Sequence, residues 1–458
     1  MSLDVRPAVA PAPPWSFPGQ RSDHLSNGLH VAHVEVPGQH VLSLRLGIPI
    51  SLSAEPRHLE GVATLMARGL DEGTLRHTAQ EFAELIERHG IALGAGVGER
   101  GLVIEMEVMA HHFGQAVDIL AQCLVEASYP DVEVARLRRA RLSDIEHEYA
   151  DAGARAAMEF AQGYFRADDR AHRPIAGSRD SVAAITAQDV RDYHHAVLAP
   201  QGATLVVAGD TTGLQEPLLR VLERGLSHWV GPGRGGDEGA RPVEAPIGVR
   251  QEDASRIVLV DRPGSAQSHL VLGRPGPHRR TPHGWGAYQV LAFVLGGSPG
   301  ARIDAVLREE KGYTYGLRAT FRPRRDSGVC SVSGAVRADA TAPALAELMQ
   351  VLSLRGSDLT EREVQHGADF VAKTAPGRYG TADTIASEVV RLALDDLGGD
   401  FVTATLETAR SLTRGHAAAA WDEVCAGPGW TTVVVADADT HRGPVEALGL
   451  GEVVVVRG

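Results

Sequence analysis

The sequence contains few cysteines and no long hydrophobic stretch. Its three cysteines, Cys123, Cys330 and Cys425, lie far apart, so a disulfide framework is not expected. No run of 18 apolar residues occurs, which argues against a membrane-spanning helix. The first twenty residues also lack the basic and apolar regions of a signal peptide. We therefore expect a soluble protein of the reducing cytoplasm.

Positive charge is scarce as well. Lys and Arg number 45 against 58 Asp and Glu, which gives a net charge of −13 and argues against a nucleic-acid partner. The acidic excess is compatible with an interior that accepts basic peptides, although general solubility is the simpler explanation. What the chain has is length: 458 residues, 43% of them hydrophobic, suffice for two or more domains with ordinary cores.

Proline and glycine mark the expected domain boundaries. Residues 1–21 are rich in proline and read as a flexible arm, and residues 225–248 are rich in Gly and Pro without hydrophobic periodicity, as in a linker. These segments predict an N-terminal half at 22–224 and a C-terminal half at 249–458.

Local patterns predict alternating strands and helices. An Asn27-Gly28 pair between apolar residues is a strong hairpin signal. Alternating hydrophobicity predicts strands at residues 41–46, 102–108 and 203–208, and helical spacing predicts helices at 113–124 and 285–295. Two capping boxes, Thr78 with Glu81 and Thr186 with Asp189, mark the starts of further helices.

The two halves repeat each other at an offset of about 226 residues. The segment Leu-Gly-Ile-Pro at 46–49 recurs as Leu-Gly-Arg-Pro at 272–275, and the strand at 203–208 recurs at 431–436. Two equivalent halves built of strands and helices are typical of the α+β or α/β classes.

The stretch 61–74, Gly-Val-Ala-Thr-Leu-Met-Ala-Arg-Gly-Leu-Asp-Glu-Gly-Thr, is the most informative segment. Its frame resembles the zinc helix of the pitrilysin/insulinase metallopeptidases, a family that includes the mitochondrial processing peptidases. In that family the helix carries two zinc-binding histidines and a glutamate that acts as general base. The frame is kept here by Gly61, Ala63, Gly73 and Thr74.

The resemblance also shows what has been lost. Thr64 and Arg68 stand at the two histidine positions, and Ala67 stands at the glutamate position. A guanidinium does not lose its proton, and a methyl group offers no donor atom. Asp144, 76 residues after Arg68, stands where the family has its third ligand, a glutamate. One carboxylate cannot hold zinc alone, so we expect no metal or other cofactor in this chain. Without the family resemblance, Asp144 would be interpreted as an ordinary solvated helix residue.

Other candidate ligand sites are weak. The adjacent pairs His111–His112 and His194–His195 point about 100° apart on a helix and cannot chelate as pairs. The Gly-rich stretch at 296–302 opens a helix but lacks a phosphate-binding Walker pattern.

A second motif lies in the C-terminal half. Residues 307–316, Leu-Arg-Glu-Glu-Lys-Gly-Tyr-Thr-Tyr-Gly, resemble the family motif whose Arg and Tyr contact the substrate beside the zinc. The resemblance assigns these roles to Arg308 and Tyr315. Without it, Arg308 would be a solvated residue paired with Asp304, and Tyr315 would pack in a strand.

The resemblance covers residues 22–440 and implies an α+β fold of two homologous halves, each a mostly antiparallel sheet with helices on one face. In this family one subunit often carries the zinc motif and its partner carries the Arg/Tyr pair. The chain is therefore predicted to be the non-zinc subunit of a heterodimeric zinc endopeptidase that cleaves peptides or unfolded segments. It would be inactive alone, with zinc in the partner subunit and no nucleic-acid or membrane partner. The alternatives are a purely structural docking subunit and a homodimeric peptide-binding protein.

Overall fold

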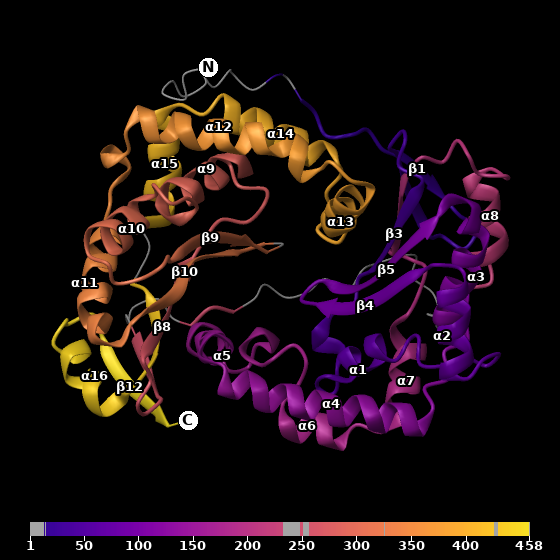
Figure 1. Cartoon of the computed structure of the whole chain (residues 1–458), viewed down its shortest axis with the longest axis horizontal. Helices are drawn as coiled ribbons and strands as arrows, with labels where there is room; N and C mark the ends of the chain where they lie inside the picture. Colours follow the sequence, from indigo (N-terminus) through magenta and orange to yellow (C-terminus); the bar gives the residue numbers. More distant parts are fainter. Residues whose placement is uncertain are drawn as a thin grey trace, which may run out of the picture.

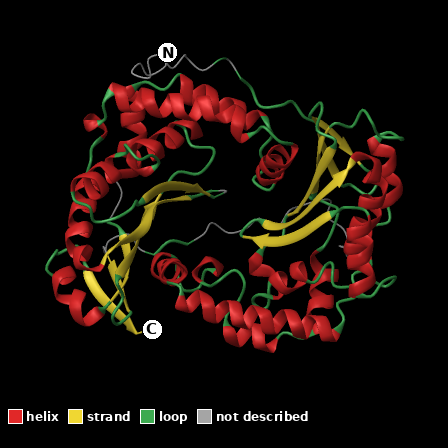
Figure 2. Cartoon of the chain, viewed as in Figure 1, coloured by secondary structure: helices red, strands yellow, loops and turns green. Residues whose placement is uncertain are grey.

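A computed structural model describes residues 13, 15–231, 248–250, 256–324, 326–425 and 429–457. Figure 1 shows two halves, each built around one sheet, and Figure 2 shows the strands on the inner side of the molecule with helices around them. No helix in the described ranges is long and apolar enough to cross a membrane.

The N-terminal sheet has the strand order β1-β2-β6-β3-β5-β4, and only β2 and β6 run parallel. Its strands are β1 (Arg21–His24), β2 (His30–Glu35), β3 (Val41–Ile48), β4 (Ala92–Gly98), β5 (Gly101–Met109) and β6 (Thr204–Gly209). The C-terminal sheet has the order β12-β7-β11-β8-β10-β9, with β7 parallel to both β11 and β12. Its strands are β7 (Arg256–Asp261), β8 (Gln267–Pro275), β9 (Arg318–Pro323), β10 (Gly328–Arg337), β11 (Thr431–Ala436) and β12 (Glu452–Arg457).

Helices cover the outer face of each sheet. The N-terminal half contains α1 (Val62–Arg68), α2 (Ala79–Arg88), α3 (Phe113–Val125), α4 (Asp131–Ala150), α5 (Ala152–Tyr164), α6 (Arg179–Ala184), α7 (Ala187–Val197) and α8 (Leu218–Leu226). The C-terminal half contains α9 (Trp285–Gly296), α10 (Arg302–Asp304), the π-helical turn η5 (Ala305–Glu310), α11 (Thr341–Leu352), α12 (Glu361–Arg378), α13 (Ala382–Ala393), α14 (Asp400–Arg410), α15 (Arg414–Cys425) and α16 (Ala438–Glu446). The α+β class and the mostly antiparallel sheets expected from the sequence are confirmed.

The predicted local signals form the predicted elements. Thr78 accepts a hydrogen bond from the backbone N–H of Glu81, and Thr186 caps α7 through Asp189 in the same way. The strand expected at 41–46 continues through Gly47 to Ile48. Alternate residues of β3 face the helices and are buried in the N-terminal core: Leu42, Leu44, Leu46 and Ile48.

Each sheet also receives a helix from the opposite half on its inner face. Helix α13 of the C-terminal half packs on β3 and β6, and α5 of the N-terminal half packs on β8 and β11. We call α5 and α13 the crossed helices. Apart from the crossed helices, each half covers the outer face of its own sheet with its own helices, as expected. The helix on the inner face comes from the other half and was not expected from the sequence.

The repeat glycines lie at these two contacts. A Cβ atom on Gly47 of β3 would approach Val390 Cγ2 of α13 to 2.6 Å, and one on Gly273 of β8 would approach Phe160 Cζ of α5 to 2.3 Å. The glycine of the repeated Leu-Gly motif therefore gives each crossed helix room to approach its strand.

Polar contacts also join the halves. Arg45 of β3, 3% exposed, donates to Glu107 at 2.8 Å and forms an ion pair with Asp383 of α13. The turn between β4 and β5 reaches the C-terminal half, where Arg100 donates to the Pro323 carbonyl at 3.1 Å and pairs with Asp395. The two halves are thus held together through charges as well as apolar packing.

The expected boundary segments are only partly described. Residues 1–12 and 14 of the arm and 232–247 of the linker lie outside the described residues, and α8 extends to Leu226, inside the expected linker. Residues 15–20, which we call the strap, do not form a flexible arm but pack on the C-terminal half. Trp15 stacks on Tyr379 with 5.9 Å between ring centroids. Phe17, 6% exposed, donates its backbone N–H to Thr403 Oγ1 at 3.2 Å. Aromatic burial here outweighs the flexibility expected from the prolines.

Candidate functional site

The N-terminal end of α1 is fixed by buried charges. Gly61 has φ of +101°, and a Cβ atom there would lie 2.8 Å from the Ala176 carbonyl oxygen. Glu55 Oε1 accepts hydrogen bonds from the N–H groups of Gly61 at 3.0 Å and Ala63 at 3.1 Å, and Oε2 pairs with Arg170 at 2.9 Å. Burial raises the pKa of Glu55, while Arg170 acts in the opposite direction. This network holds α1 in place.

A buried Tyr–His pair lies behind the C-terminal end of α1. A Cβ atom on Gly69 would lie 3.0 Å from the Tyr129 ring. His194 Nε2 lies 3.0 Å from the Leu124 carbonyl, to which it must donate, so Nδ1 accepts from the Tyr129 hydroxyl at 2.9 Å. Burial lowers the pKa of His194 to about 4. The ring is therefore neutral at physiological pH.

The positions that the family uses for zinc hold an ion pair. Arg68 Nη1 lies 2.8 Å from Asp144 Oδ2, with 39% and 42% of the two side chains exposed. Thr64 is half-buried, and Ala67 is 3% exposed. The structure thus joins two of the predicted positions in a surface ion pair. Asp144 is exposed to solvent, as in an ordinary helix residue, and has Arg68 as its partner.

These residues do not fit zinc. The guanidinium of Arg68 is a permanent cation on the carboxylate that would otherwise be a ligand, and the other two positions supply a hydroxyl and a methyl group. Over the described part of the chain, no group of three or more His, Cys, Asp or Glu side chains is arranged to hold a metal ion.

Arg308 and Tyr315 both lie in the C-terminal half, Arg308 within η5 and Tyr315 in the connection between η5 and β9. The Arg308 side chain is 39% exposed, and its Nε lies 3.4 Å from Glu309 Oε1. Tyr315 is 90% exposed and precedes β9. The alternative in which Tyr315 packs in a strand is therefore wrong. Both side chains are accessible to a ligand or another subunit.

The loop that carries Tyr315 is held in place by hydrogen bonds to Asp304 and to β10. Asp304, fully buried, accepts from the Leu317 N–H at 3.4 Å and pairs with Arg318 at 3.2 Å. Thr314 donates to the Ala335 carbonyl at 2.6 Å. Asp304 is thus engaged by Arg318 and not by Arg308, which corrects the pairing expected from helical spacing.

The two predicted site regions belong to different halves. In the residues that the structure covers, neither Arg308 nor Tyr315 forms a hydrogen bond or ion pair with Arg68 or Asp144. The Arg/Tyr pair and the Arg68–Asp144 pair therefore have no direct polar contact with each other in the described residues.

The part of the N-terminal sheet's inner face that α13 does not cover carries mainly glycine and alanine along β4. This feature was not predicted from the sequence. Alternate residues of the edge strand β4 are exposed and small, and a Cβ atom at Gly94, Gly96 or Gly98 would meet nothing within 4 Å. The neighbouring positions on β5 are acidic, with Glu105 paired to Gly94 and Glu107 to Ala92 in the register. The alternation of small residues at 92–98 was the available signal.

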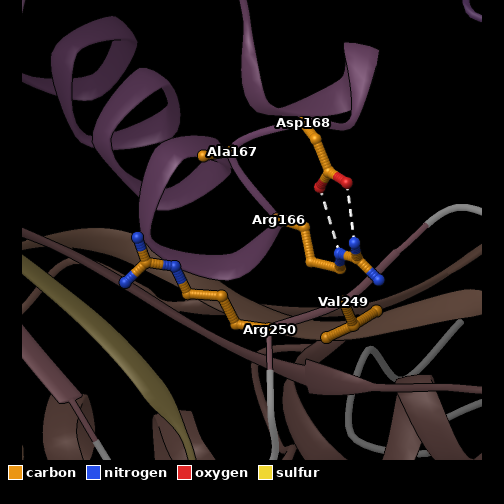
Figure 3. A pocket seen from close by; sticks show the side chains of 5 residues that line it. All are labelled: Arg166, Ala167, Asp168, Val249 and Arg250. Carbon is orange, nitrogen blue, oxygen red and sulfur yellow. Dashed lines mark hydrogen bonds and ion pairs between the residues drawn. The ribbon is translucent and has the colours of Figure 1, made fainter.

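A cavity of about 580 Å³ lies elsewhere, where the end of α5 meets the start of the C-terminal half (Figure 3). Arg166 donates to both carboxylate oxygens of Asp168, at 3.0 and 2.6 Å, and Arg250 extends away from this pair. Ala167 and Val249 complete the lining. The lining holds no nucleophile or histidine and includes none of the predicted site residues, so the cavity is not a candidate catalytic site.

Two family models match the sequence. The model described as insulinase (peptidase family M16) matches residues 30–168, and the model described as peptidase M16 inactive domain matches residues 184–368. Among curated proteins, an uncharacterized zinc protease of Mycobacterium tuberculosis is 27% identical over 366 residues, which cover 78% of this chain and 80% of the relative. A protein named a non-peptidase homologue from Helicobacter pylori is 23% identical over 263 residues, covering 57% and 58% of the two chains.

Solved structures share the fold. A peptidase M16 inactive domain from Pseudomonas fluorescens superimposes with a TM-score of 0.81 at 20% identity, covering 91% of this chain and 98% of that one. A protease from Helicobacter pylori gives 0.79 at 15% identity, covering 92% and 100%. A chain of complex III from Candida albicans gives 0.73 at 14% identity, covering 94% and 100%.

Proposed function

Because this chain belongs to the insulinase family of peptidases, M16, we propose that it is the non-zinc subunit of a heterodimeric zinc endopeptidase. Its partner would be a homologous subunit with an intact zinc motif, and the pair would cleave peptides or unfolded segments. The buried thiols of Cys123 and Cys330 support a cytoplasmic location.

The Arg68–Asp144 ion pair is the observation that carries this proposal. It occupies two of the former ligand positions with charges that satisfy each other at 2.8 Å. A single substitution of Arg68 would not restore a zinc site, since Thr64 and Ala67 lack the other donors. The chain thus keeps the glycines and small residues that surround the family's zinc helix but lacks the metal ligands. This favours a role as the non-catalytic partner of a subunit with an intact zinc site.

Arg308 and Tyr315 would supply that support. Zinc bound in the partner would polarise the scissile carbonyl and activate water. A phenol hydroxyl aimed at the developing oxyanion stabilises it, and a guanidinium holds a neighbouring substrate carbonyl. The 90% exposure of Tyr315 on an anchored loop supports a contact outside this chain.

The inner face around β4 supports peptide binding. An edge strand has backbone groups that can pair with an extended segment, and the open space at Gly94 and Gly96 leaves room for side chains of a bound peptide. Glu105, whose side chain is 55% exposed, adds negative charge beside this strand. Basic residues in a bound segment would therefore be favoured.

The test is co-expression with a zinc-motif homologue from the same genome. A complex of the two chains in a 1:1 ratio should cleave flexible peptides, whereas this chain alone should bind no stoichiometric zinc and cleave nothing. In the complex, Tyr315→Phe should lower turnover by about 10²–10³ while assembly and zinc content stay unchanged. Arg308→Ala should mainly raise the Michaelis constant if the guanidinium binds ground and transition states alike.

Matched controls are Tyr149→Phe and Arg362→Ala, which remove the same groups from exposed positions on α4 and α12. If the Tyr315 and Arg308 variants assemble and cleave at the wild-type rate, the catalytic role is wrong and a docking subunit takes its place. If no zinc-motif homologue binds the chain, a homodimeric peptide-binding protein is the remaining alternative.

A further inference from the structure

The two sheets have four edge strands, of which β4 is the proposed peptide-binding edge and β1 and β9 are protected against pairing with another chain. β1 is a short strand with the sequence Arg-Ser-Asp-His, and β9 carries two arginines and ends in Pro323. Short length, charge and proline are the usual means by which proteins keep an edge from associating.

The fourth edge, β12, lacks such protection. Its sequence is Glu-Val-Val-Val-Val-Arg, and it pairs with β7 on one side while no described strand pairs with the other side. The four valines from Val453 to Val456 are half-buried. Val453 and Val455 pack against the main C-terminal core and Val456 packs against the smaller cluster under α5, so both faces of the strand contact the protein. A run of β-branched residues without an interior charge or proline is well suited to accept another strand.

We propose that β12 pairs antiparallel with the β12 of a second copy of this chain around a two-fold axis. Strand pairing about such an axis is antiparallel and isologous. With the axis between Val454 and Val455, Glu452 of each copy faces Arg457 of the other. The two six-stranded C-terminal sheets join into one continuous sheet across the dimer.

The charges identify a second copy as the occupant. The strand begins with an acid and ends with a base, so its antiparallel image places opposite charges together at both ends. A parallel partner would place Glu452 against Glu452 and Arg457 against Arg457. The strand's sequence thus selects its own antiparallel copy, whereas a general peptide-binding edge would need no such symmetry.

The location fits this interface and leaves the Arg/Tyr surface free. β12 and β9 are opposite edges of the C-terminal sheet, and Tyr315 precedes β9. Figure 1 shows β12 at the periphery beside the C-terminus. The proposal does not depend on a zinc-bearing partner, because pairing at β12 uses only this chain.

Sedimentation of the purified full chain between 1 and 100 µM tests the proposal. The wild type should be dimeric at the upper concentration. Arg457→Glu and Glu452→Arg should each place like charges together at both ends of the strand pair and weaken dimerisation about tenfold or more. The double variant Glu452→Arg/Arg457→Glu restores opposite charges and should restore the wild-type dissociation constant.

The matched control is Arg362→Glu, which makes the same charge change at an exposed site on α12. Circular dichroism of each variant checks that the fold is kept, and the double variant keeps the test valid if one single variant fails to fold. A wild-type chain that stays monomeric at 100 µM overturns the proposal. So does a dimer that both single variants retain, or one that the double variant does not recover.

Discussion

The two crossed helices make the same exchange but differ in how they hold the opposite sheet. Helix α5 covers the C-terminal sheet through a small separate cluster of apolar residues: Ala156, Val258, Val260, Val271, Val433 and Val435, with Phe160 at its side. On the other side of the molecule, inward residues of the N-terminal sheet belong to the main core of the C-terminal half: Ala32, Val34, Val206 and Ala208. The α13 contact is thus part of a domain core, whereas the α5 contact is a local one.

Charge adds to this difference. The α13 contact contains Arg45, whose side chain is 4% exposed and engages Glu107 and Asp383. At the α5 contact, the residue that fills the glycine space is the half-buried Phe160. The buried ion pair on this helix, Arg155 with Glu159 at 3.0 Å, joins two residues of α5 and does not link the halves. The duplicated topology therefore does not have equal energetics in the two halves: the N-terminal sheet depends more on the other half than the C-terminal sheet does.

The largest effect is expected at Arg45. Arg45→Met removes a buried guanidinium that also donates to the backbone carbonyls of Leu44 and Met106. Its carboxylate partners Glu107 and Asp383 are 31% and 53% exposed and stay partly solvated, so the free energy of unfolding should fall by about 2–3 kcal/mol. Chemical denaturation measures it. The control Arg76→Met removes an arginine with 49% side-chain exposure and should cost less than about 1 kcal/mol. Equal losses would show that the buried charge does not distinguish the two contacts.

The next largest effects are expected when alanine replaces the glycines that face the crossed helices. Gly47→Ala drives a Cβ atom toward Val390, a stiff β-branched residue that is 2% exposed, and should cost about 2 kcal/mol. Gly273→Ala meets the ring of Phe160, which is half-buried and can rotate, so a loss of about 1 kcal/mol is expected. Gly94→Ala, which meets nothing, is the control and should change stability by less than about 0.5 kcal/mol. A larger loss of stability in Gly273→Ala than in Gly47→Ala would show that the α5 contact, and not the α13 contact, is the more tightly packed of the two.

Mild acid should weaken the N-terminal half through His194. Its folded pKa of about 4 lies below the ordinary value of 6.5, so the native state resists protonation that the unfolded state accepts. Stability from this group is complete above pH 6.5 and is lost as the pH falls toward 4. Between pH 7 and 5.5 the loss should be about 1 kcal/mol. Unfolding titrations of the wild type and His194→Gln test this: the variant should lack that part of the pH dependence, and an unchanged slope would reject the assignment.

The smallest effect is expected at the former zinc position. Arg68→Met removes an ion pair whose side chains are 39% and 42% exposed, so stability should change by less than about 1 kcal/mol. Turnover of the proposed heterodimer should also stay unchanged in this variant, in contrast to Tyr315→Phe. A large loss of activity in Arg68→Met would mean that the N-terminal half also takes part in the chemistry.

Local structure was largely predictable from the sequence. Hydrophobic alternation and capping boxes placed β3, α2 and α7 within a few residues, because neighbouring side chains determine these signals. The repeat identified Gly47 and Gly273 as equivalent. The sequence did not predict that these glycines make room for α5 and α13, because each of these helices comes from the opposite half and contacts its glycine only in the folded chain.

The site was predictable in its positions but not in its contacts. The spacing of Arg68 and Asp144 came from the family frame, and the structure shows that the two pair directly. Pairing of Arg308 with Asp304 assumed ordinary helical spacing, but residues 305–310 form a π-helical turn that changes the side-chain positions. The strap was missed because proline content indicated flexibility, while Trp15 and Phe17 find an aromatic partner far along the chain.

The crossed helix α13 sets the order in which the chain can complete its fold during synthesis. Gly47 and β3 leave the ribosome about 340 residues before Val390. At ordinary translation rates this delay is on the order of tens of seconds. Throughout that time the inward face of the N-terminal sheet, including Val206 once it is made, waits without its cover. The inner cover of the first sheet is therefore completed only after the last third of the chain has emerged.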